Sequence, residues 1–269
     1  MSLDIYKKSN DVTSTQGDTM LSLASHELRT PLSIIKWYTE MLLDGDAGPL
    51  TTDQSKYLRT IQVSNQRAID LIRSLLNVSR LDLDTFSIVP MDIDLRFLLK
   101  QVISENKILL EERNIAVEES YLGSVPGVIG ILHADKQICL VIMRILFMNA
   151  VLFSKENSSV FTAIQEVKQG EVLGLKRLND DSFVISFTDN GIGIPDEDKE
   201  KIFSKFFKAG NAINEDSKGA GLSLYIVRTI LDKIGGDVWF TSTQNKGSAF
   251  YVSFPKSGMS VKQGKTTLD

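Results

Sequence analysis

The sequence of 269 residues holds one cysteine, two histidines and six prolines. A single cysteine, Cys139, excludes a framework of disulfide bonds within the chain and fits a reducing compartment. Because it lies in the apolar run ICLVIM, we expect it to be buried in the core. No uninterrupted apolar stretch reaches the roughly 18 residues of a membrane helix, and the N-terminus lacks the apolar block of a signal peptide. We therefore expect no membrane contact from this chain itself.

Runs of basic residues are absent too, since none is longer than a pair such as Lys7-Lys8. With a net charge of −4, this argues against a surface built for nucleic acid. Hydrophobic residues make up 42% and charged residues 24%, which is the composition of an ordinary globular protein. The length suggests two domains.

Two amphipathic helices are predicted in the first third of the chain. Apolar residues recur at alternating steps of three and four at Leu21, Ala24, Leu28, Pro31, Ile35, Tyr38 and Leu42. Gly45, Gly48 and Pro49 then break the pattern, and Thr51 or Thr52 can cap a second helix. That helix has the same spacing at Leu58, Ile61, Ala68, Ile72 and Leu75. The two helices are expected to form an antiparallel hairpin.

A hairpin of two amphipathic helices cannot cover its own apolar stripe well. We expect a second copy to complete a four-helix bundle as a homodimer. The alternative is that the stripe packs against the rest of the same chain.

The pattern changes near residues 84–92, where helix periodicity stops and Pro90 appears, so we place a domain boundary there. A helix over 94–114 is predicted next, followed by strands in IAVEESY and VPGVIGI and a helix from Asp135. Further strands are predicted at 158–167, 182–189, 237–244 and 248–255. The fold class is therefore α+β, with the helical hairpin followed by a two-layer α/β sandwich. The expected domains are a linker (1–14), the helical hairpin (15–85), the sandwich (92–257) and a loose polar tail (258–269).

The stretch SHELRTPL, residues 25–32, holds His26 outside the apolar stripe, so its imidazole should face water. A neutral imidazole is a nucleophile near pH 7, and the carboxylate of Glu27 could hold the other ring N–H. Thr30 lies on the same helix face and could position a water molecule. The plain alternative is a surface histidine beside a surface glutamate. However, a proline inside a helix destabilises it by about 3 kcal/mol. We therefore expect Pro31 to have a role that compensates for this loss of helix stability.

This stretch resembles the phosphoacceptor box of two-component sensor histidine kinases. The resemblance implies that His26 takes the γ-phosphoryl group of ATP, that Glu27 acts as base, and that an aspartate of a response regulator receives the phosphoryl group. The pattern from Glu27 to Thr30 implies dephosphorylation of the regulator as a further activity. His133, by contrast, directly precedes a predicted helix start, and we expect it to have a structural role.

Two glycine-containing stretches resemble the G1 and G2 boxes of the gyrase-type ATPase fold found in these kinases. In DNGIGIP, Asp189 would accept a hydrogen bond from the adenine amino group, and Gly191 and Gly193 would let the ligand approach the backbone. In KGAGLSLYIV, the residues Gly219, Gly221 and Leu222 precede an apolar helix whose free N–H groups could meet phosphates. Each stretch alone is also a common turn. A P-loop of the GxxxxGK[ST] type is absent.

Between these boxes, KIFSKFFK resembles the family's F box. Phe203 and Phe206 would steady a lid formed by AGNAINEDSK, and Lys208 would lie near the γ-phosphate. The simpler interpretation of both phenylalanines is core packing.

The stretch RILFMNAVLFS resembles the N box only in part. Asn149 would help to hold Mg²⁺ and Phe153 would pack against the base. However, Ile145 and Leu152 stand where the family usually has an asparagine and a lysine, so one positive charge is missing.

The resemblance covers residues 15–256 and implies a cytoplasmic, ATP- and Mg²⁺-dependent kinase, or the cytoplasmic part of a membrane-bound one. Ile145 and Leu152 leave open a pseudokinase or phosphatase-biased scaffold with weakened ATP binding. A gyrase-like ATPase that moves nucleic acid is disfavoured by the acidic pI of about 5.4.

Overall fold

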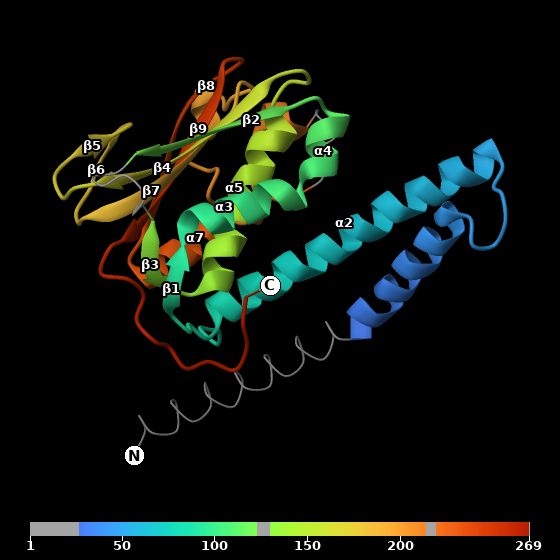
Figure 1. Ribbon diagram of the computed structural model, residues 1–269, viewed down its shortest axis with the longest axis horizontal. Helices are drawn as coiled ribbons and strands as arrows, with labels where there is room; N and C mark the ends of the chain where they lie inside the picture. Colours follow the sequence, from blue (N-terminus) through green and yellow to red (C-terminus); the bar gives the residue numbers. More distant parts are fainter. Residues whose placement is uncertain (1–26, 123–129, 214–218, 269) are drawn as a thin grey trace. The chain divides into compact units, whose positions relative to one another are not determined.

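The computed structural model describes residues 27–122, 130–213 and 219–268. The chain divides into two compact units, shown in Figure 1. The first is helical and runs up to Thr85, and the second is an α/β unit that holds most of the chain from Phe86 onward.

The helical unit is a hairpin. Its first helix covers residues 27–44, and the turn after it contains Gly45 and Gly48, which both have positive φ. The second helix, α2, spans Thr52–Asp82 and is capped by Thr51, whose hydroxyl accepts from the amide of Gln54 while the Gln54 side chain accepts from the amide of Thr51. This reciprocal capping box fixes the start of α2 where the sequence predicted it.

A buried polar side chain makes a hydrogen bond between the two helices. Thr39 and Asn65 are buried, and the Asn65 side-chain amide donates to the carbonyl of Leu32 at 2.8 Å. Much of the predicted apolar stripe instead stays exposed, including Leu28, Ile35 and Tyr38. The exposed apolar residues of the hairpin are Leu28, Ile34, Ile35, Trp37, Tyr38, Tyr57, Ile61, Val63, Leu71 and Leu75. The hairpin thus has apolar surface that its own two helices do not cover.

The α/β unit is built on a five-stranded sheet in the order β2-β4-β7-β9-β8. The strands are β2 (Ala116–Leu122), β4 (Ser159–Val167), β7 (Ser182–Thr188), β8 (Asp237–Thr243) and β9 (Gly247–Pro255). Only the β2–β4 pair is parallel, and the other pairs are antiparallel. All five strands fall where the sequence pattern predicts them.

Helices cover one face of this sheet (Figure 1). They are α3 (Leu95–Glu105), α4 (Lys107–Glu112), α5 (Lys136–Phe153) and α7 (Ser223–Ile234). The Phe147 ring of α5 meets Phe187 of β7 edge to face, with 6.4 Å between the ring centroids. The result is the expected two-layer sandwich, so the α+β fold class is confirmed.

Helix α5 is the most apolar helix of the sandwich. Among the described residues it alone is long and apolar enough to span a membrane by composition, and more than half of it is buried in the unit, as in a core helix. Cys139 lies on it with no exposed surface, and burial raises the pKa of its thiol well above the ordinary value. The expected core position of Cys139 is confirmed.

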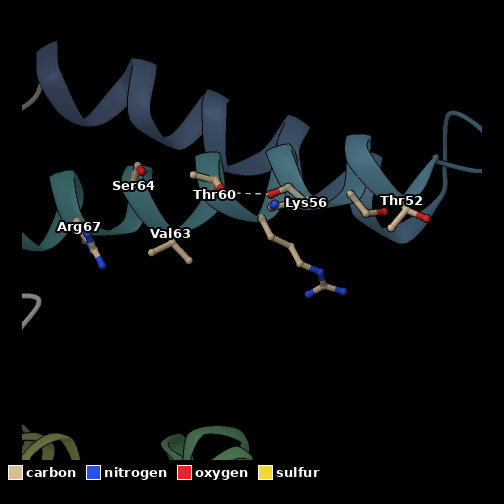
Figure 2. A pocket seen from close by; sticks show the side chains of 8 residues that line it. Thr52, Lys56, Thr60, Val63, Ser64 and Arg67 are labelled. Carbon is tan, nitrogen blue, oxygen red and sulfur yellow. Dashed lines mark hydrogen bonds between the residues drawn. The ribbon is translucent and has the colours of Figure 1, made fainter. Parts of the chain in front are cut away.

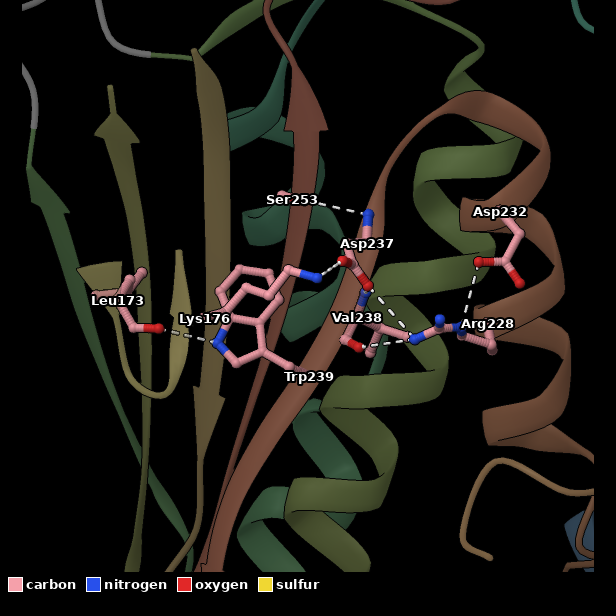
Figure 3. A network of polar contacts seen from close by, with 8 residues as sticks. All are labelled: Leu173, Lys176, Arg228, Asp232, Asp237, Val238, Trp239 and Ser253. Carbon is pink, nitrogen blue, oxygen red and sulfur yellow. Dashed lines mark hydrogen bonds and ion pairs between the residues drawn. The ribbon is translucent and has the colours of Figure 1, made fainter. Parts of the chain in front are cut away.

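A small hairpin of β5 (Val172–Leu173) and β6 (Lys176–Arg177), not predicted from the sequence, lies on the side of the sheet away from α5 (Figure 1). Trp239, only 8% exposed, stacks on Tyr251 and donates its indole N–H to the carbonyl of Leu173 at 3.1 Å. Figure 3 shows that Asp237, beside Trp239, pairs with both Lys176 and Arg228. These contacts join the small hairpin to β8 and α7.

Two further short strands belong to the α/β unit. β1 (Met91–Asp94) pairs antiparallel with β3 (Ile131–Ala134), and Asp92 accepts from His133 Nδ1 at 2.8 Å. This hydrogen bond between the two strands fits the structural role expected for His133. The predicted helix over 94–114 is in fact two helices separated at Asn106, and most of the predicted strand in VPGVIGI lies outside the described residues.

The C-terminal residues do not form the loose tail that their polar composition suggested. Met259 and Leu268 are buried, and Lys262 and Thr266 form β-bridges with Ile88 and Phe86. Backbone pairing holds this segment, which a composition argument does not detect.

Candidate functional site

The loop after β7 begins with a buried carboxylate. Asp189 is 5% exposed, and its Oδ1 accepts from the amides of Gly191 at 2.8 Å and Ser248 at 3.2 Å. Burial raises the pKa of Asp189 to about 6, although both backbone N–H groups favour the ionised form. Since both of these hydrogen bonds use Oδ1, the carboxylate can offer Oδ2 to a ligand donor.

Gly191 brings this loop against the end of α5. A Cβ atom at Gly191 would lie 1.9 Å from the carbonyl oxygen of Phe153, and that oxygen accepts from the amide of Ile192 at 3.3 Å. Only glycine permits this approach. The structure therefore brings together the Asp189 loop and the end of the helix that carries Asn149 and Phe153.

Gly193 is held from the other side by the turn between β8 and β9. It has a φ of +60°, and a Cβ there would lie 2.1 Å from the carbonyl oxygen of Thr243. The amide of Asn245 donates to Ile192 at 2.8 Å, and the amide of Ile194 donates to the Ser242 hydroxyl at 2.8 Å. The backbone of the loop is thus fixed in advance of any ligand.

Asn149 and Phe153 are both half-buried and lie one helical turn apart near the end of α5. The helix end is capped by Arg113, whose guanidinium donates to the carbonyls of Val151 at 2.6 Å, Leu152 at 2.8 Å and Ser154 at 2.9 Å. A positive charge at a helix C-terminus also interacts favourably with the negative end of the helix dipole. Sequence reasoning missed Arg113, because its partners are 38 to 41 residues away.

The F-box stretch forms turns rather than a helix. Phe203 packs edge to face on Phe240, with 6.0 Å between the ring centroids. Phe206, however, is 64% exposed and has a φ of +62°, so core packing is wrong for this residue. Lys208 follows as a half-buried residue.

The G2 stretch leads into α7. Gly221 has a φ of +71°, and a Cβ there would lie 2.6 Å from the carbonyl oxygen of Phe207, so this glycine allows contact with the F-box stretch. Leu222 is 1% exposed, and no described side chain caps the start of α7. The first N–H groups of α7 can therefore meet an anion. Gly219 is exposed, and Lys218 lies outside the described residues.

Asn211 is a second residue that sequence reasoning did not single out. It lies in α6 (Gly210–Ile213), and its side-chain amide donates to the carbonyls of Gly193 at 2.9 Å and Ile192 at 3.4 Å. The amide of Gly210 donates at 2.8 Å to the carboxylate of Asp198, which is the last residue of the short 3-10 helix Asp196–Asp198. The segment after the F box is thereby attached to the loop of Asp189.

In the hairpin, His26 lies outside the described residues. Glu27 and Thr30 lie on the first helix, three residues apart and both exposed, so their side chains share one solvent-facing side. Pro31 lies inside this helix and lacks the N–H that would bond the carbonyl of Glu27.

A dedicated metal cage is absent from the described part of the chain, where no three His, Cys, Asp or Glu side chains are grouped. The amide oxygen of Asn149 is a hard ligand of the kind that Mg²⁺ accepts. Asn149 therefore offers one protein ligand that fits a Mg²⁺ ion.

A rigid loop with a buried carboxylate, an uncapped start of α7 and a mixed sheet with helices on one face agree with the resemblance to the gyrase-type ATPase fold. Residues 135–258 match the family described as histidine kinase-, DNA gyrase B- and HSP90-like ATPase, and residues 18–84 match the His Kinase A (phospho-acceptor) domain. The chain belongs to the two-component sensor histidine kinases.

Named relatives agree with this assignment. The circadian input-output histidine kinase CikA of Synechococcus elongatus is 27% identical over 238 residues, which are 88% of this chain and 29% of CikA. The sensor histidine kinase WalK of Bacillus subtilis is 28% identical over 241 residues, 86% of this chain and 35% of WalK. The chain thus spans about a third of the length of these curated relatives.

Solved structures share the fold. Full-length ShkA in complex with AMPPNP has a TM-score of 0.67 at 23% identity, covering 91% of this chain and 47% of ShkA. The histidine kinase ThkA in complex with the response regulator protein TrrA has a TM-score of 0.56 at 21% identity, covering 94% of this chain and 67% of the ThkA chain.

Proposed function

We propose that this chain is the catalytic core of an ATP-dependent protein histidine kinase. A ring nitrogen of His26 attacks the γ-phosphorus of ATP, the bond from that phosphorus to the β,γ-bridging oxygen breaks, ADP leaves, and Glu27 takes the imidazole proton. The phosphoryl group then passes to an aspartate of a response regulator, and Thr30 with Glu27 positions a water molecule for the reverse, dephosphorylating activity. The observation that carries the proposal is the buried Asp189 at the head of a loop tightened by Gly191.

In this proposal the α/β unit binds ATP between the Asp189 loop and α7. Asp189 accepts from the adenine amino group and Phe153 packs against the base. Gly191 and Gly193 have no side chain, so the nucleotide can approach the backbone of the loop. Backbone N–H groups that face the phosphates come from Gly219, Gly221 and Leu222. Lys208 supplies positive charge near the γ-phosphate. Mg²⁺, held by Asn149 and the phosphates, would neutralise charge on the triphosphate when bound.

The hairpin is proposed to dimerise. Its exposed apolar residues, such as Leu28, Ile35 and Leu75, would be buried by a second copy in a four-helix bundle. We take the phosphoacceptor hairpin as residues 15–85 and the ATP-binding domain as residues 92–257. The named relatives are kinases or sensor proteins, and none favours the pseudokinase interpretation.

The response regulator is proposed to dock on a groove along α2 (Figure 2). The groove is lined by Thr52, Ser55, Lys56, Arg59, Thr60, Val63, Ser64 and Arg67. Lys56, Arg59 and Arg67 make it basic, which complements a receiver domain that presents a phosphoacceptor aspartate.

The central experiment is incubation of the full chain with γ-³²P-labelled ATP and Mg²⁺. The wild type should acquire acid-labile label, and His26→Ala should acquire none. His133→Ala is the matched control, because it removes the only other histidine, which is exposed and pairs with Asp92. Label that survives in His26→Ala, or no label in the wild type, would contradict the proposal.

A further inference from the structure

The segment after β9 runs back along the α/β unit and holds the first residues of that unit. Figure 1 shows it in red, passing β3 and β1. We call residues 258–268 the C-terminal strap. Its carbonyl at Thr266 accepts from both the amide (2.8 Å) and the hydroxyl (3.1 Å) of Ser87. Lys262 and Ile88 exchange two backbone hydrogen bonds, at 2.9 and 3.1 Å.

Packing accompanies these hydrogen bonds at Phe86, which has no exposed surface. The Lys262 ammonium lies 3.8 Å from the centroid of the Phe86 ring, and that of Lys233 lies 5.9 Å from it. A Cβ at Gly264 would lie 2.3 Å from the carbonyl carbon of Phe86, so the strap backbone is in direct contact with the backbone of residues 86–88. Two buried side chains, Met259 and Leu268, fix the strap on either side of this contact.

The contact is not part of either family domain. The matches cover residues 18–84 and 135–258, so residues 86–88 and almost all of the strap lie outside them.

The strap holds the residues that connect the two units. Helix α2 ends at Asp82, and the amides of residues 83–85 donate back to carbonyls of α2, so the held residues 86–88 follow it directly. After them, the amide of Val89 donates to Asp135 at 2.8 Å. Without the strap, residues 86–88 would lose their backbone hydrogen bonds to Lys262 and Thr266. Fully extended, this freed segment of three residues reaches about 10 Å, at about 3.4 Å per residue.

We propose that the C-terminal strap is a positioning element for the phosphoryl transfer proposed above, on which this inference rests. By holding Phe86, Ser87 and Ile88, it limits the orientations in which the ATP-binding unit can meet His26. It touches no nucleotide-binding residue named above. Releasing it should therefore slow autophosphorylation at saturating ATP, by about threefold or more from the added freedom of residues 86–88, without changing the affinity for ATP.

The test uses Gly264→Val in the full chain, because a side chain there cannot fit against Phe86. Lys262→Pro is a second variant, which removes the amide that donates to Ile88 and leaves Gly264 intact. Lys265→Ala, an exposed change in the same strap, is the control. Hydrogen exchange at the amides of Ser87 and Ile88 reports the contact itself. The rate of His26 labelling and the KM for ATP report its effect.

We expect protected Ser87 and Ile88 amides in the wild type and in Lys265→Ala, and faster exchange, slower labelling and an unchanged KM in the two strap variants. Protection that persists in both variants would overturn the contact. Faster exchange with an unchanged labelling rate, or with a raised KM, would overturn the positioning role. A wild type that incorporates no label at His26 would overturn the proposed function and the positioning role with it. The exchange data would still decide whether the strap holds residues 86–88.

Discussion

The Asp189 carboxylate, at the end of β7, accepts a hydrogen bond from the backbone amide of Ser248, 59 residues later on β9. This contact ties the proposed adenine-recognition residue to the middle of the sheet. It also leaves the carboxylate buried, and burial is what raises its pKa to about 6.

ATP affinity should fall as the pH drops from 7 to 5, because protonation of Asp189 near pH 6 removes the ionised acceptor for the adenine amino group. Titration calorimetry with ATP at several pH values measures this. Asp189→Asn should bind weakly at every pH and lose the dependence. Asp196→Asn, whose carboxylate is exposed, should keep it. An affinity for ATP that is constant between pH 5 and 7 in the wild type would contradict this role.

The same shift has the opposite sign for stability. Because the pKa of Asp189 is higher in the folded chain than its ordinary 3.8, its contribution to the free energy of unfolding is fully present below pH 3.8. That contribution is lost as the pH rises through about 6. Compared with Asp189→Asn, the wild type should therefore lose stability across this window, as denaturant unfolding at pH 4.5 and 7 can measure.

Gly191→Ala should both destabilise the α/β unit and weaken ATP binding. The new Cβ would collide with the carbonyl oxygen of Phe153, and overpacking of this kind costs about 1–3 kcal/mol. Thermal unfolding and ATP titration report the two effects. The matched control for stability is Gly210→Ala, where the nearest atom to the new Cβ is Asp198 Oδ2 at 3.8 Å. Equal melting temperatures for both variants would show that the loop adjusts freely.

Arg113→Ala should lower the free energy of unfolding by about 2–4 kcal/mol, since it leaves three carbonyls at the end of α5 without a charged donor. Arg113→Lys should recover only part of the loss, because an ammonium cannot reach all three carbonyls as the planar guanidinium does. Urea unfolding measures both. If the alanine and lysine variants proved equally stable, the contacts of the Arg113 guanidinium with several carbonyls at once would not contribute to the free energy of unfolding.

Arg59→Glu should slow phosphotransfer to a receiver domain about tenfold or more and leave His26 autophosphorylation unchanged. The reason is that the groove on α2 would lose one of its three basic side chains and gain a negative charge. Arg73→Glu, an exposed change on the same helix outside the groove, is the control. Comparable transfer rates for the two variants would place the docking surface elsewhere.

The parts of the fold that sequence predicts well are those that local pattern determines. Thr51 caps α2 as expected, and Asp135 caps α5 at the predicted helix start, because an N-cap acts within three residues of itself. The five sheet strands are apolar enough to be found by pattern alone. The glycine spacing of the Asp189 loop likewise predicts a tight backbone, which Gly191 and Gly193 have.

Features that depend on distant partners were not predictable. Arg113 acts on a helix end 38 to 41 residues away, and nothing in its neighbourhood indicates this. The strap is polar and is held through its backbone, so its composition is typical of a loose tail. Phe206 shows the reverse case: it is an apolar residue that suggests core packing, but it is exposed and its backbone has a left-handed conformation.

The two tryptophans lie in different units, Trp37 in the hairpin at 58% exposure and Trp239 in the sandwich at 8%. In the undimerised chain their emission should therefore differ in wavelength and in quenching by iodide, with Trp37 red-shifted and accessible and Trp239 blue-shifted and shielded. Replacing either one with phenylalanine leaves a single intrinsic fluorophore. The melting of each unit could then be followed separately, without attaching any dye.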